Sequence, residues 1–123
     1  MVGYFDEKGD PKIKIIIGGR RNSAEIDAIF DTGCSGYLVL PILKAIQLGL
    51  ELVGVEPVKY ADGRITNQFV FGVLVDIDGE QKIVPATLTW SEETLVGISL
   101  FKDYSVEIDF KNKEIKIQKV TGE

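Results

Sequence analysis

Histidine is missing altogether from this chain of 123 residues. Ser-His-Asp triads, Cys-His dyads and histidine-ligated metal sites are therefore excluded within it. Any proton transfer that the chain catalyses would have to use Asp, Glu, Lys, Tyr or water. Cys34 is the single cysteine, which excludes an internal disulfide framework and fits a reducing compartment.

The sequence also lacks segments suited to a membrane or to nucleic acid. No apolar run reaches the ~20 residues that a helix needs to cross a bilayer. The first residues, MVGYFDEKGDPK, contain acidic side chains and no apolar core of a secretory signal. The formal net charge is −5 and the basic residues are scattered, so a basic footprint for phosphates is missing. We therefore expect a cytoplasmic protein that binds neither membranes nor nucleic acid.

The composition is that of one compact domain. Hydrophobic residues make up 45% of the chain and charged residues 27%, a balance that supports a core and argues against disorder. The length fits a single domain, and no linker, low-complexity stretch or internal repeat interrupts it. We therefore interpret residues 1–123 as one domain.

Short apolar segments separated by turn signals dominate the chain. The expected strands cover residues 12–17, 24–30, 55–60, 65–71, 71–77, 82–89, 104–110 and 114–117. Asp62-Gly63 and Asp78-Gly79 are turn signals that join two of these pairs into hairpins. Many short strands with a turn about every ten residues are typical of a sandwich or a barrel.

Two short helices are expected among the strands. Pro41 suits the first position of a helix through PILKAIQLG, and Gly49 suits its C-terminal stop. A second short helix is predicted over residues 99–103, with Ser99 as its N-cap. Residues 1–10 show no clear strand.

The segment FDTGCSG, Phe30 to Gly36, contains the residues best suited to chemistry. Asp31 directly follows an apolar strand, so its carboxylate can project into a cleft. The hydroxyl of Thr32 can brace the loop, and Gly33 permits a tight turn and the close approach of a substrate. By itself the tripeptide is a weak signal, and Asp31 could merely be an acidic residue of a turn.

With its flanks, this motif resembles the retropepsin-like aspartic peptidases, single-domain relatives of the retroviral proteases. The resemblance covers about residues 12–119 and includes the hairpin into Asp31-Thr32-Gly33 and the short strand ending in Leu40-Pro41. It also includes the hairpin around residues 61–64 and the element Leu95-Val96-Gly97. The run DTGCSGYLVLP is especially similar to the small prokaryotic members of this clan.

The resemblance implies a mainly β fold, a closed acid-protease barrel with one or two short helices that forms one lobe per chain. It also implies an aspartic endopeptidase that works as a homodimer on a polypeptide substrate, with no metal or other cofactor. Water would be activated between Asp31 of each of the two chains. The single motif supports the dimer independently, because this reaction needs two carboxylates.

The resemblance also assigns roles to individual residues. Asp31, Thr32 and Gly33 would form the catalytic loop, with Thr32 bracing it across the dimer and Gly33 accepting the substrate backbone. The residues expected to bind substrate are Ser35, the flap tip Ala61, Asp62 and Gly63, and the pocket residue Leu95.

Two positions depart from the family pattern. Gly97-Ile98-Ser99 stands where retroviral members usually carry Gly-Arg and then Asp or Asn, so the arginine of their interface network is missing. Cys34 stands where a small or apolar residue is common, and we expect it to be a buried structural thiol. Without histidine it lacks the usual activating base of a nucleophile.

Two alternatives stay open at this point. The acidic pairs Asp76 with Asp78 and Glu92 with Glu93 could suggest a metal site, but we interpret them as solvated turn residues. The whole chain could also be a non-catalytic dimerisation or peptide-binding module on the same fold, because a fold does not determine a function.

Overall fold

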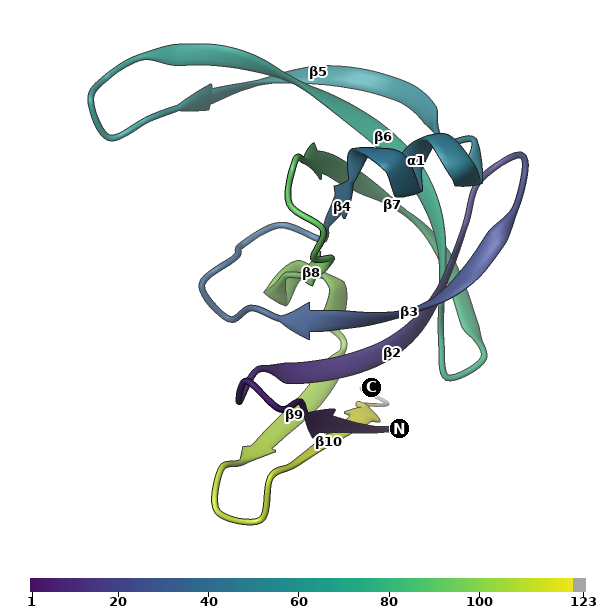
Figure 1. The fold of residues 1–123 in the computed structure, drawn as a ribbon, viewed down its shortest axis with the longest axis vertical. Coiled ribbons are helices and arrows are strands. Elements are labelled where there is room, and N and C mark those ends of the chain that lie inside the picture. The colour runs from purple at the N-terminus through teal and green to yellow at the C-terminus, as the bar shows by residue number, and fades with distance from the viewer. Residues whose placement is uncertain (121–123) are drawn as a thin grey trace.

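The computed structural model describes residues 1–120, and strands dominate them (Figure 1). The strands are β1 (Val2–Phe5), β2 (Pro11–Gly18), β3 (Ser23–Phe30), β4 (Leu38–Pro41), β5 (Glu51–Lys59), β6 (Ile65–Ile77), β7 (Glu80–Thr89), β8 (Leu95–Val96), β9 (Tyr104–Asp109) and β10 (Glu114–Lys119). The helices are α1 (Ile42–Leu48) and the 3₁₀ helix η1 (Ile98–Phe101). The predicted mainly β fold with short helices is confirmed.

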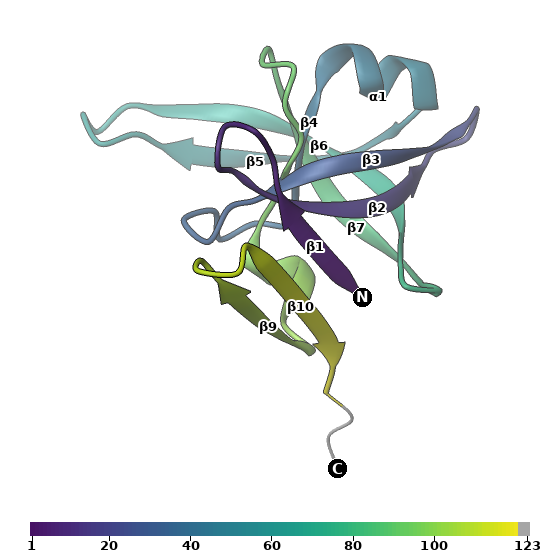
Figure 2. The same ribbon diagram turned by 60° about the horizontal axis from the view of Figure 1, so that its bottom comes forward.

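All these strands belong to one sheet, in the order β5-β6-β7-β4-β8-β3-β2-β1-β10-β9. An additional antiparallel pairing of β6 with β2 closes the strands from β6 through β2 into a ring. Figure 2 shows β9 and β10 lying beyond this ring, on the side where the chain ends. The molecule is therefore one sheet partly closed on itself, not two packed sheets as in a sandwich.

The interior of the ring holds the core. Successive residues of a strand point to opposite faces, so the apolar residues at alternate positions face inward together. The most deeply buried side chains of β2 and β6 are at most 2% exposed, and they are Ile13, Ile15, Ile17, Val73, Val75 and Ile77. Leu100 and Phe101 of η1 are also buried, so the 3₁₀ helix belongs to the core.

The predicted hairpins are present, with one difference. Asp78 and Gly79 both adopt positive φ, 53° and 89°, as a two-residue hairpin turn with this sequence requires. The segments expected at 65–71 and 71–77 form the single strand β6, because no turn residue separates them. β6 changes partners along its length, pairing with β5 in its first half and with β7 and β2 in its second.

The first helix ends as predicted but begins one residue later. Pro41 is the last residue of β4 and the N-cap of α1, with extended backbone, and not the first helical residue. Gly49 adopts φ 71°, and its N–H donates to the carbonyl oxygens of Ala45 at 3.1 Å and Ile46 at 3.2 Å. The expected glycine stop is therefore confirmed.

Two local predictions were wrong. Ser99 is not an N-cap, because η1 begins at Ile98 and its N-cap is Gly97. The Ser99 hydroxyl instead donates to the carbonyl oxygen of Ser35 at 2.5 Å. The N-terminal residues do form a strand, since β1 pairs with both β10 and β2; this strand is held by partners distant in sequence.

The short strand β8 fixes the loop between β3 and β4. It pairs in parallel with β3 and antiparallel with β4, so it lies between them. Backbone hydrogen bonds then tie the segment 96–99 to the loop: Asp31 N–H to Val96 O at 3.0 Å, Gly97 N–H to Tyr37 O at 2.9 Å, Ile98 N–H to Cys34 O at 3.0 Å and Ser99 N–H to Gly36 O at 3.2 Å. The conformation of the loop thus depends on the segment that crosses it.

This crossing requires glycine at position 97. A Cβ added to Gly97 would lie 2.2 Å from the carbonyl oxygen of Gly36 and 2.8 Å from that of Cys34. Both obstacles are backbone atoms, which are unable to rotate away as a side chain would. Any larger residue must push β8 and the loop apart.

We expect Gly97→Ala to lower the free energy of unfolding by about 1–3 kcal/mol, the usual cost of forcing extra volume into a packed site. Chemical denaturation monitored by the circular dichroism of the β-sheet measures this. The matched control is Gly54→Ala, where an added Cβ meets nothing within 4 Å, so stability should hardly change. Equal stability of the two variants would contradict the close approach.

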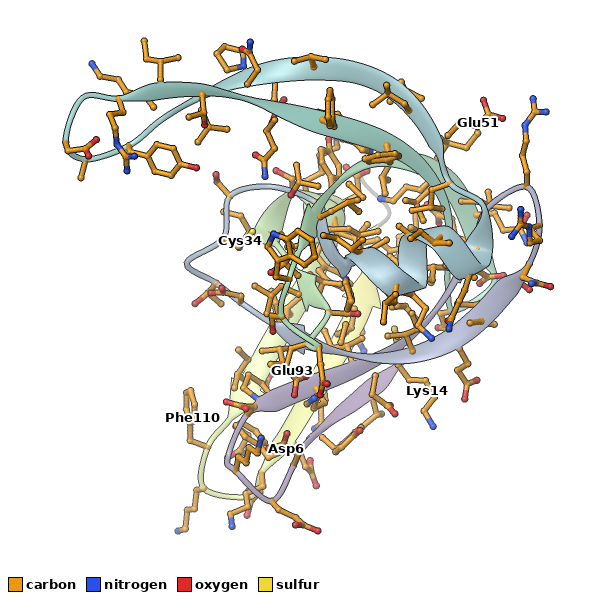
Figure 3. All side chains as sticks on the ribbon, turned by 45° about the horizontal axis from the view of Figure 1, so that its top comes forward. Asp6, Lys14, Cys34, Glu51, Glu93 and Phe110 are labelled. Atoms are coloured by element: carbon orange, nitrogen blue, oxygen red, sulfur yellow. The ribbon has the colours of Figure 1, made fainter. Side chains whose placement is uncertain are left out.

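An ion cluster joins the turn before β2 to the segment before β8 (Figure 3, where Asp6 and Glu93 are labelled). Lys12 is only 9% exposed, and its ammonium lies 3.1 Å from Glu93 and 3.6 Å from Asp6. Burial works to lower the pKa of Lys12, but the hydrogen bond and charge of Glu93 and the charge of Asp6 raise it overall. The pKa of Asp6 is lowered, chiefly by the N–H of Asp10 at 2.9 Å.

This lowered pKa of Asp6 predicts how acid affects stability. A depressed carboxyl pKa stabilises the folded state above the unfolded value of about 3.9, and the contribution is lost as the pH falls through the folded pKa. Asp6→Asn should therefore melt at a lower temperature than the unmodified chain at pH 7, with the difference closing towards pH 3. Melting curves across this range test it, with Glu7→Gln as the control; a constant difference would refute it.

Candidate active site

Asp31 lies where the buried strand β3 meets the surface. The strand's last residue, Phe30, is 6% exposed and packs against Phe101, while Asp31 is half-buried. One carboxylate oxygen, Oδ1, accepts the N–H of Gly33 at 2.9 Å, and the Asp31 carbonyl accepts the N–H of Cys34 at 3.1 Å. These bonds form an Asx-type turn that orients the side chain.

The second carboxylate oxygen of Asp31 is free for chemistry. Among residues 1–120 it accepts no hydrogen bond and takes part in no ion pair. Thr32 and Gly33 are exposed beside it, while Leu95 is half-buried and pairs with Ile29 of the same strand that leads into Asp31. A carboxylate held by one oxygen and open at the other can bind water or a second acid.

A cleft of about 530 Å³ lies beside this loop, under the β5–β6 hairpin. Its residues come from the loop, from β4, β7 and the hairpin, and from the start of η1: Gly33, Cys34, Ser35, Gly36, Tyr37, Leu38, Val39, Glu56, Gln68, Val70, Pro85, Thr87 and Ser99. Figure 1 shows the hairpin reaching out from the ring on the side where the loop lies.

The tip of the hairpin has the geometry of a tight polar turn. Gly63 adopts φ 89°, and Asp62 accepts the N–H of Arg64 at 3.0 Å and its Nε at 2.7 Å. The Arg64 guanidinium lies 5.3 Å from the centre of the Tyr60 ring. Ala61 is exposed like its neighbours. The predicted turn is present, but its residues extend past the cleft and do not line it.

The structure therefore brings together only part of the predicted site. Gly33 and Ser35 line the cleft, and Asp31 and Thr32 are held next to them in the same loop. Leu95 approaches from the β8 side, and Ala61, Asp62 and Gly63 lie at the far end of the hairpin. These last three would reach a substrate only if the hairpin bends over it or a second chain brings the substrate to them.

Sequence reasoning missed the cleft residues Glu56 and Gln68. They are directly opposite each other in the register of β5 and β6. The signal was available, because both lie six residues from Asp62 in the turn. Counting outward from an Asp-Gly turn identifies cross-strand pairs whenever the hairpin has no bulge between them.

Cys34 is half-buried and lines the cleft, so the expectation of a buried thiol was wrong. Its neighbours in the loop, Thr32, Gly33, Ser35 and Gly36, are exposed, so the loop lies at the surface and covers Cys34 only in part. The acidic pairs are not simply solvated either. Asp76 accepts the N–H of Gly79 at 2.8 Å within its turn, and Glu93 pairs with Lys12.

The described residues contain neither a metal site nor a membrane-spanning helix. Residues 1–120 contain no group of three or more His, Cys, Asp or Glu side chains placed to hold a metal ion. Neither helix in this part of the chain combines the length and hydropathy needed to cross a membrane.

Comparison with known proteins gave matches only among solved structures. No family model and no curated protein matches the chain. A retropepsin-like aspartic protease from Rickettsia conorii superposes with a TM-score of 0.67 at 18% identity, covering 94% of this chain and 86% of that one. The EIAV protease, solved with the inhibitor HBY-793, gives 0.57 at 16% identity, covering 80% and 91%.

A third solved structure, from a protozoan, has the same architecture. The retroviral protease-like domain of Ddi1 from Leishmania major superposes with a TM-score of 0.53 at 14% identity, covering 89% of this chain and 90% of that domain. Bacterial, viral and protozoan structures thus share the arrangement of strands described above over most of their lengths. The chain therefore has the retropepsin-like fold.

Proposed function

We propose that the chain is an aspartic endopeptidase that hydrolyses peptide bonds as a homodimer. The observation that carries the proposal is the Asp31 carboxylate, held by Gly33 through one oxygen and open at the other, in the loop whose following residues line the cleft. The proteins that share the fold include aspartic proteases from a bacterium and a retrovirus, which supports this chemistry over others.

The reaction follows from placing two such carboxylates together. Two acids a few ångströms apart do not both ionise at low cost, so the pair retains one proton over a range of pH. The ionised Asp31 takes a proton from a water molecule as this attacks the peptide carbonyl carbon. The protonated partner donates a hydrogen bond to the carbonyl oxygen, and a proton then passes to the leaving amine as the C–N bond breaks. No covalent intermediate is needed.

The homodimer completes a site that one chain leaves half-built. The chain has one Asp-Thr-Gly motif, and its residues Thr32 and Gly33 are exposed. Ile98, beside the loop, is 48% exposed, an apolar surface that a second copy would cover. In this dimer the Thr32 hydroxyls would brace the two loops, and Gly33 would accept the substrate backbone.

A non-catalytic peptide-binding or dimerisation module is the second candidate. Ile98 favours it, because retroviral members usually carry arginine there. The short polar turn at the flap tip favours it as well. The two functions share the cleft and differ in the use of the Asp31 carboxylate.

The substitution Asp31→Asn distinguishes the peptidase from the non-catalytic module. Removing the ionisable group should lower kcat/KM on an unstructured protein by at least about 10²–10⁴-fold, the usual contribution of a positioned acid or base. Melting temperature and solution mass should be unchanged. Cleavage is followed from about pH 4 to 7, with and without pepstatin, and with Asp103→Asn as the matched control. An Asp31→Asn variant that cuts normally would refute the peptidase.

Mixing wild-type and variant chains tests whether two chains form one active site. If wild-type and Asp31→Asn chains are mixed in equal amounts and exchange freely, random pairing leaves about one quarter of the dimers with two aspartates. Specific activity per total chain should fall to about one quarter of that of the unmixed wild type. A fall to one half would mean that each chain acts alone. Native mass spectrometry of the mixture measures the pairing directly.

A further inference from the structure

The cleft contains a single formal charge. Of the residues that line it, Glu56 is the only Asp, Glu, Lys or Arg. The walls around it are mostly apolar or uncharged, with Val39, Val70 and Pro85 among them. A lone carboxylate on such a surface sets the charge that a bound peptide meets.

The register of the hairpin puts Glu56 on the cleft face. Glu56 pairs with Gln68, and the next cleft residue on β6 in the same alternation is Val70. Val55 and Phe69, one position away on each strand, point to the opposite face and are 54% and 60% exposed. The pattern therefore presents an acid to the cleft and apolar side chains to the outside.

Glu56 has no partner of its own within the described part of the chain. It takes part in none of the ion pairs or side-chain hydrogen bonds formed among residues 1–120. The nearby arginine of the hairpin, Arg64, is paired with Asp62 at the tip. The Glu56 carboxylate is thus available to a ligand in the cleft.

We infer that Glu56 is a specificity-determining residue that selects a lysine or arginine side chain of the peptide under the hairpin; this inference rests on the proposed function. The methylene stem of such a side chain would pack on the apolar walls while its charged end meets the carboxylate. An acidic side chain at the same position is repelled. In a homodimer each chain supplies one Glu56, so the preference appears on both sides of the cleaved bond.

The size of the preference follows from the exposure of Glu56. Glu56 is exposed in the single chain, and a charge pair at such a site discriminates by at most about fivefold, an effect that weakens as salt screens it. We therefore expect peptides with Lys to be cut about two- to fivefold faster, in kcat/KM, than matched peptides with Gln. Peptides with Glu at that position should be slower than those with Gln.

The test uses peptides identical except for Lys, Gln or Glu at one position, moved in turn along both sides of the cleaved bond. In the Glu56→Gln variant, kcat/KM for the Lys peptide divided by kcat/KM for the Gln peptide should approach one. In the Glu56→Lys variant, the Glu peptide should become the preferred substrate. Glu107→Gln makes the same charge change on β9, outside the cleft, and should retain the wild-type ratio. A wild type without preference, or a ratio that Glu56→Gln leaves unchanged, overturns the inference.

Binding to the Asp31→Asn chain separates failure of this inference from failure of the peptidase. Fluorescence anisotropy of the same labelled peptides is measured with Asp31→Asn alone and with Glu56→Gln added. Tighter binding of the Lys peptide that disappears with Glu56→Gln retains the inference even if the wild type cuts nothing. Cleavage without any dependence on Glu56 retains the peptidase and refutes the inference. If the protein shows no cleavage and no selective binding, both proposals are refuted.

Discussion

The close crossing of residues 96–99 over the Asp31 loop is the constraint on which the rest of the site depends. Backbone hydrogen bonds hold the crossing at both ends, and the gap between the two backbones at Gly97 excludes even one methyl group. Because β8 is inserted between β3 and β4, the crossing also joins the two halves of the ring. The loop conformation that orients Asp31 is therefore set by the same contacts that close the core.

The long strand β6 explains why a cleft exists beside this loop. Its second half is sealed into the ring by β7 and β2, while its first half has only β5 as a neighbour. The hairpin therefore leaves the body of the molecule with one face towards the loop. A ring that closed over its full length would have buried this face, and nothing could have entered. The open site follows from unequal pairing along one strand.

A single chain supplies half of what aspartic-peptidase chemistry needs. Asp31 is oriented by Gly33 and unopposed on its other side, and the surface around it is exposed. A second chain would supply the second acid and would bury Ile98 with the loop. Glu56 adds a charge to a cleft that is otherwise neutral. Catalysis and selectivity would thus reside in separate elements, the first in the loop after β3 and the second in the hairpin.

Much of this protein could be predicted from local sequence. Alternation in residues 12–17 and 24–30, the Asp-Gly turns and Gly49 act through the nearest neighbours in the chain, and each produced the structure that it predicts. Asp31 was proposed as the catalytic residue from its motif, and this stays a prediction. Other features depended on distant partners: β1 forms because β10 and β2 hold it, Ser99 bonds to Ser35 instead of capping a helix, and Gly97 is required by a loop some sixty residues away. Local propensity contains no information on such contacts, so only the tertiary structure decided which residues line the cleft beside the Asp31 loop.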